Sequence, residues 1–146
     1  MFRRPYYSHL FRFLSQGKRV FYIVESSKSF YEATFDLPPV VQRLGFVILN
    51  VQDTGEMLRR KEIDLDEECQ VFDVCNYRQM EKILAIDIRL ALTLPWRITV
   101  FTEDGATKLG IVRPASLTER LDENPVLARV LAEVEEKLIQ IVDETR

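Results

Sequence analysis

The sequence predicts a mixed α+β domain, and three features of its pattern indicate this class. Segment 96–112 alternates apolar and polar residues on both sides of an Asp-Gly pair, which is typical of a β-hairpin. Segment 125–144 carries apolar residues at helical spacing behind an Asn-Pro pair. Short stretches rich in β-branched and aromatic residues precede both segments. A chain of 146 residues is expected to combine these elements in one domain.

The first expected elements are a strand over residues 19–26 and a helix that begins at Ser29 and runs toward Gly45. The sequence Ser-Phe-Tyr-Glu places Glu32 at the third helical position, which forms a capping box with the serine. The pair Pro38-Pro39 interrupts the helical pattern, because proline removes a backbone donor. We expect either a kink there or a stop near Asp36 followed by a restart.

The middle of the chain predicts short elements in alternation. An apolar strand is expected over 46–51 and a short polar helix or turn over 53–61. The next strand is expected over 70–75, followed by a helix over 77–85. Segment 86–94 is compatible with a strand or with continuation of that helix.

The hairpin is the strongest local signal, because Asp104-Gly105 is a preferred centre for a two-residue turn. This turn fixes the register of the flanking strands and places matching side chains opposite each other. The expected pairs are Glu103 with Ala106, Phe101 with Lys108, Val100 with Leu109, and Ile98 with Ile111.

The last helix is expected to begin after Asn124, with Pro125 at its first position. Its apolar stripe comprises Leu127, Val130, Leu131, Val134, Leu138 and Ile141.

Charge separates the chain into an extension over residues 1–19 and a domain over residues 20–146. The extension holds five Lys and Arg residues and no acid, and since the whole chain carries −3, residues 20–146 carry −8. Such an acidic body is not expected to bind nucleic acid. In the extension, Tyr6, Tyr7, Leu10, Phe13 and Leu14 recur at helical spacing. We expect an amphipathic helix that packs on its own domain or a partner, or alternatively contacts an anionic membrane surface or serves as an organellar targeting leader.

The cysteine and histidine content argues against metal and disulfide chemistry. Cys69, Cys75 and His9 are three residues without a paired spacing, whereas a structural zinc site needs about four ligands. Six residues along a regular strand separate the two cysteines by about 20 Å, which a disulfide cannot bridge. We therefore expect no metal, no cofactor and a reducing compartment. The absence of a secretory pattern favours the cytoplasm.

The order of four segments resembles one protein family. These segments are YIVESSKSFYEA near the start, QVFDVCNY at 70–77, LTLPWRITVFTEDGATKLGIV at 92–112 and NPVLARVLAEVEEKL near the end. Their combination is similar to the bacterial and archaeal domain-of-unknown-function family numbered 302. The resemblance implies a curved, mainly antiparallel sheet with helices packed on it, similar to the TATA-binding-protein-like architecture. It also implies frequent homodimers and assigns no activity.

Two family motifs single out the candidate binding residues. The family's Cys-Asn-Pro corresponds to Cys75-Asn76-Tyr77, and its Leu-Pro-Cys corresponds to Leu94-Pro95-Trp96, where a tryptophan replaces the second thiol. A dithiol mechanism is therefore not expected here.

Each candidate has a functional and a structural interpretation. Cys75 is either a reactive thiol before a helix N-terminus or a small buried side chain at a strand end. Pro95 and Trp96 either wall a ligand pocket or plug the core or a dimer seam. Asn76 is expected to hold a turn or to cap the following helix rather than to contact a ligand.

These observations lead to one functional hypothesis and two alternatives. The first is a non-catalytic homodimeric module that binds a partner or a small apolar ligand. The second is thiol-dependent handling of sulfur, redox equivalents or a soft metal through Cys75. The third is a peripheral membrane protein recruited by residues 1–19.

Overall fold

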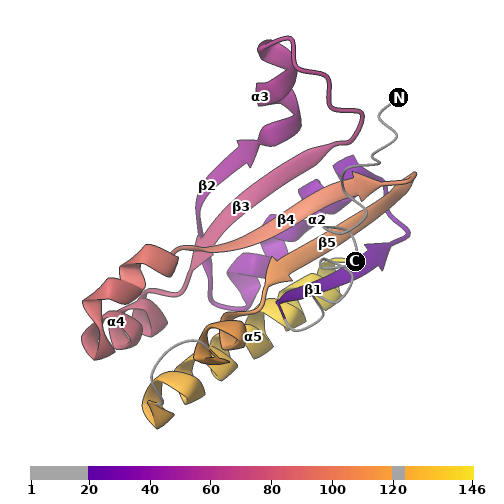
Figure 1. Cartoon of the computed structure of the whole chain (residues 1–146). Helices are drawn as coiled ribbons and strands as arrows, with labels where there is room; N and C mark the ends of the chain where they lie inside the picture. Colours follow the sequence, from indigo (N-terminus) through magenta and orange to yellow (C-terminus); the bar gives the residue numbers. More distant parts are fainter. Residues whose placement is uncertain (1–19, 120–123) are drawn as a thin grey trace.

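The computed structural model describes residues 20–119 and 124–146, and it shows a mixed α+β fold built on one antiparallel sheet (Figure 1). The sheet has five strands in the order β1-β5-β4-β3-β2. The strands are β1 Phe21–Ser26, β2 Val47–Asp53, β3 Cys69–Cys75, β4 Trp96–Glu103 and β5 Ala106–Val112. The α-helices are α2 Phe30–Arg43, α3 Thr54–Arg60, α4 Tyr77–Ile86 and α5 Pro125–Thr145, and the 3-10 helices are η3 Ile88–Thr93 and η4 Pro114–Glu119. The predicted fold class is confirmed.

Helices α2 and α5 pack on the same face of the sheet (Figure 1). The hydrophobic core lies between these two helices and the sheet. Alternate residues of each central strand point toward these helices, as the period of two in a strand requires. Fully buried members of this core include Leu37, Phe72, Val74, Ile98, Val100, Leu109, Val134 and Leu138.

Helix α2 begins as the sequence predicts. Ser29 Oγ accepts from the backbone N–H of Glu32 at 3.2 Å, and the Glu32 carboxylate accepts from the Ser29 N–H at 3.4 Å. The chain leaves the helix through Gly45, whose φ of +86° suits a residue without a side chain.

The expected stop near Asp36 is wrong, because α2 runs continuously through Pro38 and Pro39. The two carbonyl groups that lose an N–H partner are those of Thr34 and Phe35. Both residues lie on the half-buried or exposed side of the helix, where water can serve as the partner. The buried stripe through residues 33, 37 and 41 continues along the sheet and holds the helix together.

The other elements agree with their predicted positions. The short polar segment 53–61 forms α3, capped by Asp53, and the helix after β3 is α4. Segment 86–94 is neither a strand nor a continuation of the preceding helix, because α4 ends at Ile86, Asp87 is extended and Ile88–Thr93 forms the separate 3-10 helix η3. The apolar stripe of α5 is buried, and the Asn124 side chain accepts from the backbone N–H groups of Val126 and Leu127.

The hairpin between β4 and β5 has the predicted register. Its observed pairs include Glu103 with Ala106, Phe101 with Lys108, Val100 with Leu109 and Ile98 with Ile111. Asp104 and Gly105 have φ of 51° and 82°, which are the positive values that a tight hairpin turn of this type requires.

The expectations for residues 1–19, including the amphipathic helix, the membrane contact and His9, fall outside the described residues. In the two described ranges, no helix combines the length and the apolar character needed to cross a membrane.

Candidate functional site: the Trp96 pocket

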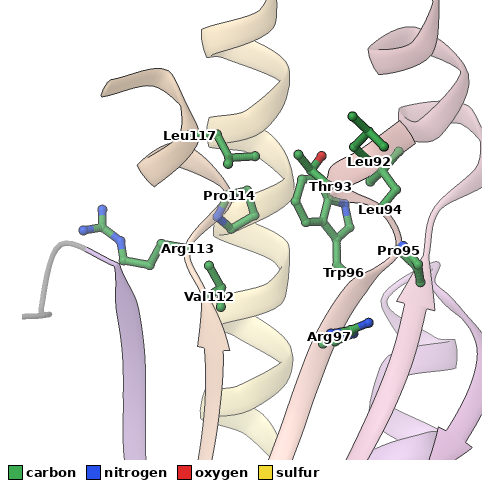
Figure 2. Close-up of a pocket in the computed structure, with 10 residues that line it drawn as sticks. All are labelled: Leu92, Thr93, Leu94, Pro95, Trp96, Arg97, Val112, Arg113, Pro114 and Leu117. Carbon is green, nitrogen blue, oxygen red and sulfur yellow. The ribbon is translucent and has the colours of Figure 1, made fainter. Parts of the chain in front are cut away.

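A pocket of about 220 Å³ lies at the end of the sheet where β4 begins and β5 ends (Figure 2). One side is formed by η3 and the start of β4, and the other by the end of β5 and η4. The lining residues are Leu92, Thr93, Leu94, Pro95, Trp96, Arg97, Val112, Arg113, Pro114 and Leu117. We call this site the Trp96 pocket.

Trp96 is positioned by the sheet and serves two purposes. It is the first residue of β4, it pairs with Val74 across the ladder, and it is only 8% exposed within the core cluster. In Figure 2 its ring lies between Pro114 and Leu117 on one side and Leu92 on the other. The two predicted roles of Trp96, packing in the core and lining a pocket, are therefore compatible, since the indole is large enough to contact the core and the pocket at once.

The polar side chains around the pocket have partners of their own. Arg97 Nε lies 3.3 Å from the Asp73 carboxylate, outside the pocket. Thr93 Oγ1 donates to the Leu90 carbonyl oxygen at 2.7 Å. Because these groups are engaged, the pocket presents mainly apolar surface from its leucine, proline and tryptophan side chains.

Glu135 of α5 holds the η4 wall in place. Its carboxylate accepts from Arg113 Nη2 at 3.2 Å and from the backbone N–H of Ala115 at 3.2 Å. Glu135 is buried, while the Arg113 side chain is one-third exposed. This pair ties the segment after β5 to the longest helix, so the position of the wall depends on a buried carboxylate.

The structure brings together only two of the five candidate residues. Pro95 and Trp96 line the pocket, whereas Cys75, Asn76 and Tyr77 do not. Asn76 is the N-cap of α4: its Oδ1 accepts from the backbone N–H of Gln79 and its Nδ2 donates to the Gly45 carbonyl oxygen, both at 3.1 Å. Tyr77 projects from the first turn of α4 and is largely exposed.

Cys75 has the environment of a structural side chain. It is free, 1% exposed and at the end of β3. Burial raises the pKa of the Cys75 thiol, which disfavours the nucleophilic thiolate. Burial also raises the pKa of Cys69, although a hydrogen bond with Thr54 acts in the opposite direction.

The sequence did not point to the second wall of the pocket. Val112 ends the hairpin, and Arg113, Pro114 and Leu117 follow it and carry no motif. These residues meet Trp96 because β5 runs antiparallel to β4. The one available signal was the Arg113-Pro114 pair, which ends the strand.

No group of three or more His, Cys, Asp or Glu side chains within residues 20–119 and 124–146 could hold a metal ion.

Comparison with known proteins gives a family and a fold but no reaction. The model of the family described as "Domain of unknown function DUF302" matches residues 22–145. A crystal structure of an uncharacterized conserved DUF302 protein from Bacillus stearothermophilus superimposes with a TM-score of 0.82 at 26% sequence identity. The match covers 87% of this chain and 98% of that chain. No curated protein matches this chain.

Proposed function

Because the chain belongs to the DUF302 family, whose description assigns no activity, we propose a function from the geometry of the pocket: a non-catalytic module that binds a small apolar ligand beside Trp96. The observation that carries this proposal is the pocket of about 220 Å³ between η3 and η4. A dry cavity of about 150 Å³ is large enough to bind benzene. The Trp96 pocket therefore matches a ligand with one or two rings, or a short branched alkyl group.

The engaged polar groups support an apolar ligand over a charged one. The ion pairs of Arg97 with Asp73 and of Arg113 with Glu135 would have to be rearranged before either guanidinium bound a ligand carboxylate. An apolar ring against the indole needs no such change. Arg97 and Arg113 line the pocket, but each guanidinium is paired with a carboxylate, which favours a ligand held mainly by burial.

The buried thiol supports this module over the thiol-dependent alternative. Cys75 is inaccessible, its pKa is raised by burial, and it lies outside the pocket. The two free cysteines are also compatible with a reducing compartment such as the cytoplasm, where we place the protein.

The ligand proposal is tested with toluene as the probe, because Trp96 is the only tryptophan in the chain. Toluene should change the Trp96 emission saturably and raise the melting temperature, since a ligand that binds only the folded state stabilises it. Leu117→Phe should fill the pocket and weaken toluene binding at least tenfold.

The matched control is Leu49→Phe, at an exposed position of β2 outside the pocket. This variant should bind toluene as the original chain does. The proposal loses its support if the original chain does not bind toluene, or if Leu117→Phe binds toluene with the same affinity as the original chain.

We also propose that the module is a homodimer, and an exposed aromatic pair on α2 favours this. Tyr31 and Phe35 are four residues apart on the helix and are 73% and 82% exposed. Large aromatic side chains on one helix face are typical of a protein interface. A two-fold contact between two copies of α2 would bury both pairs.

Light scattering at micromolar concentration should give about twice the chain mass of 17.1 kDa. Phe35→Glu should reduce the mass to that of one chain, whereas Val126→Glu, at an exposed position of α5, should not. A monomer mass for the unchanged chain over a wide concentration range contradicts this proposal.

A further inference from the structure

The indole N–H of Trp96 has no acceptor among the described residues, although the tryptophan is only 8% exposed. The Nε1 atom is not fully enclosed either. In residues 20–119 and 124–146, Gln79 Oε1 is the only completely buried side-chain polar atom that lacks a partner. An indole nitrogen donates and does not accept. Because Trp96 lines the pocket, its N–H is an unused hydrogen-bond donor at the pocket surface.

The indole nitrogen lies in apolar surroundings beside η3. In Figure 2 it points toward Thr93 and Leu94, whereas the six-membered part of the ring lies nearer to Pro114. The hydroxyl of Thr93 donates to the Leu90 carbonyl oxygen at 2.7 Å, so its proton is already engaged. A ligand that enters the pocket between η3 and η4 therefore meets this donor within a largely apolar wall.

This donor distinguishes between classes of ligand. A ligand without an acceptor leaves the N–H unpaired when it displaces water from the pocket, and an unpaired polar group in an apolar site is unfavourable. An oxygen acceptor directed at Nε1 restores the lost hydrogen bond, and the bond is stronger where the surroundings are less polar. A small number of placed polar contacts is what orients a ligand in a mainly apolar pocket.

We propose that the ligand of the Trp96 pocket is a small neutral carbonyl compound, whose oxygen accepts from the Trp96 N–H while its apolar part fills the pocket. This inference rests on the proposed function, because it names the class of ligand for the same site. The volume of about 220 Å³ exceeds the cavity of about 150 Å³ that binds benzene, which leaves room for a carbonyl group.

The two arginines that line the pocket favour a neutral acceptor over a carboxylate. Arg97 Nε lies 3.3 Å from the Asp73 carboxylate. Arg113 Nη2 lies 3.2 Å from the Glu135 carboxylate. A ligand carboxylate would compete with these protein carboxylates for each guanidinium, whereas a ketone oxygen at the indole N–H disturbs neither pair.

The test compares acetophenone with α-methylstyrene, in which a methylene group replaces the carbonyl oxygen. Trp96 is the only tryptophan in the chain, so growth on benzothienylalanine replaces this residue alone and exchanges its N–H for a sulfur that cannot donate. Calorimetry of both probes with both forms of the full chain gives four affinities. Because these form a double-mutant cycle, the different hydration of the two probes cancels.

Acetophenone should bind the exchanged chain about tenfold more weakly than the original chain, because its oxygen loses the donor. The affinity of α-methylstyrene should be the same in both. Circular dichroism establishes that the exchanged chain is folded. A second readout uses the unchanged chain, whose single indole signal in a proton–nitrogen correlation spectrum belongs to Trp96. Acetophenone should move this proton further downfield than α-methylstyrene does.

Two variants establish where the probes bind. Leu117→Phe should weaken both probes to a similar extent, because it fills the pocket, and Leu49→Phe on β2 should weaken neither. A carbonyl preference that survives the exchange at Trp96 but is lost in Arg97→Met would assign the oxygen to the arginine and overturn the inference.

Two other results separate this inference from the proposed function. An affinity ratio that the exchange leaves unchanged, with an indole proton that both probes shift alike, would overturn the carbonyl class and keep the apolar pocket. Failure of toluene, acetophenone and α-methylstyrene to bind the original chain would refute the pocket proposal and this inference together.

Discussion

Removal of the Glu135 carboxylate should loosen the wall of the Trp96 pocket and lower the stability of the whole domain. This carboxylate accepts two hydrogen bonds, from Arg113 Nη2 and from the backbone N–H of Ala115, each at 3.2 Å. In Glu135→Ala the partly buried N–H of Ala115 loses its acceptor, which costs about 1 kcal/mol. The ion pair adds about 0.5–1 kcal/mol, since Arg113 is one-third exposed and solvent screens its charge.

The expected loss of unfolding free energy for Glu135→Ala is therefore about 2 kcal/mol. Glu135→Gln should lose only about 1 kcal/mol, because an amide oxygen can still accept from Ala115. Glu136→Ala is the matched control, since Glu136 is exposed on the same helix and surface changes usually fall within about 0.5 kcal/mol.

Urea unfolding followed by Trp96 emission and by circular dichroism measures these differences. With a slope of about 2 kcal/mol per molar urea, Glu135→Ala should lower the midpoint by about 1 M. A Glu135→Ala midpoint equal to that of Glu136→Ala would refute the reasoning, because it would mean that the carboxylate does not hold η4 against α5.

Two further predictions concern the hairpin turn and the buried thiol. Gly105→Val should lower the unfolding free energy by about 1 kcal/mol or more, because φ at this position is +82° and no neighbouring atom lies within 4 Å to add a clash; unchanged thermal stability would contradict the strain argument. Cys75 should resist iodoacetamide in the folded Cys69→Ser chain from pH 5 to 9 and react only with denaturant, since burial favours the neutral thiol and raises its pKa. A labelling midpoint well below the value of about 8.5 for a free thiol would instead support the thiol-dependent alternative.

Elements with strong local signals were predictable from the sequence. The capping box at Ser29, the Asp104-Gly105 turn and the Asn124 cap each involve groups within three residues of one another, so their geometry follows from the local chain. The register of the hairpin followed from the turn for the same reason. The Pro38-Pro39 pair shows the limit of local reasoning, because packing of the buried stripe on the sheet outweighs two missing hydrogen bonds.

The candidate site was only half predictable. Pro95 and Trp96 were identified through a family motif, whereas Arg113, Pro114 and Leu117 were not identified at all. Cys75, Asn76 and Tyr77 belong to a strand end and a helix cap that serve the fold. A motif on one strand does not reveal what lies opposite, since the partner is set by pairing between distant segments.

The sequence by itself determined the α+β class, the hairpin with its register, the two capped helices and the separation of a basic extension from an acidic domain. Each of these depends on periodicity, on local hydrogen bonds or on counting charges, and none needs long-range contacts. Only the tertiary structure decided that two 3-10 helices face each other across Trp96, that Glu135 supports one of them, and that α2 and α5 pack on the same face of the sheet. Those features arise where segments far apart in the chain pack together, and no local pattern encodes which surfaces meet.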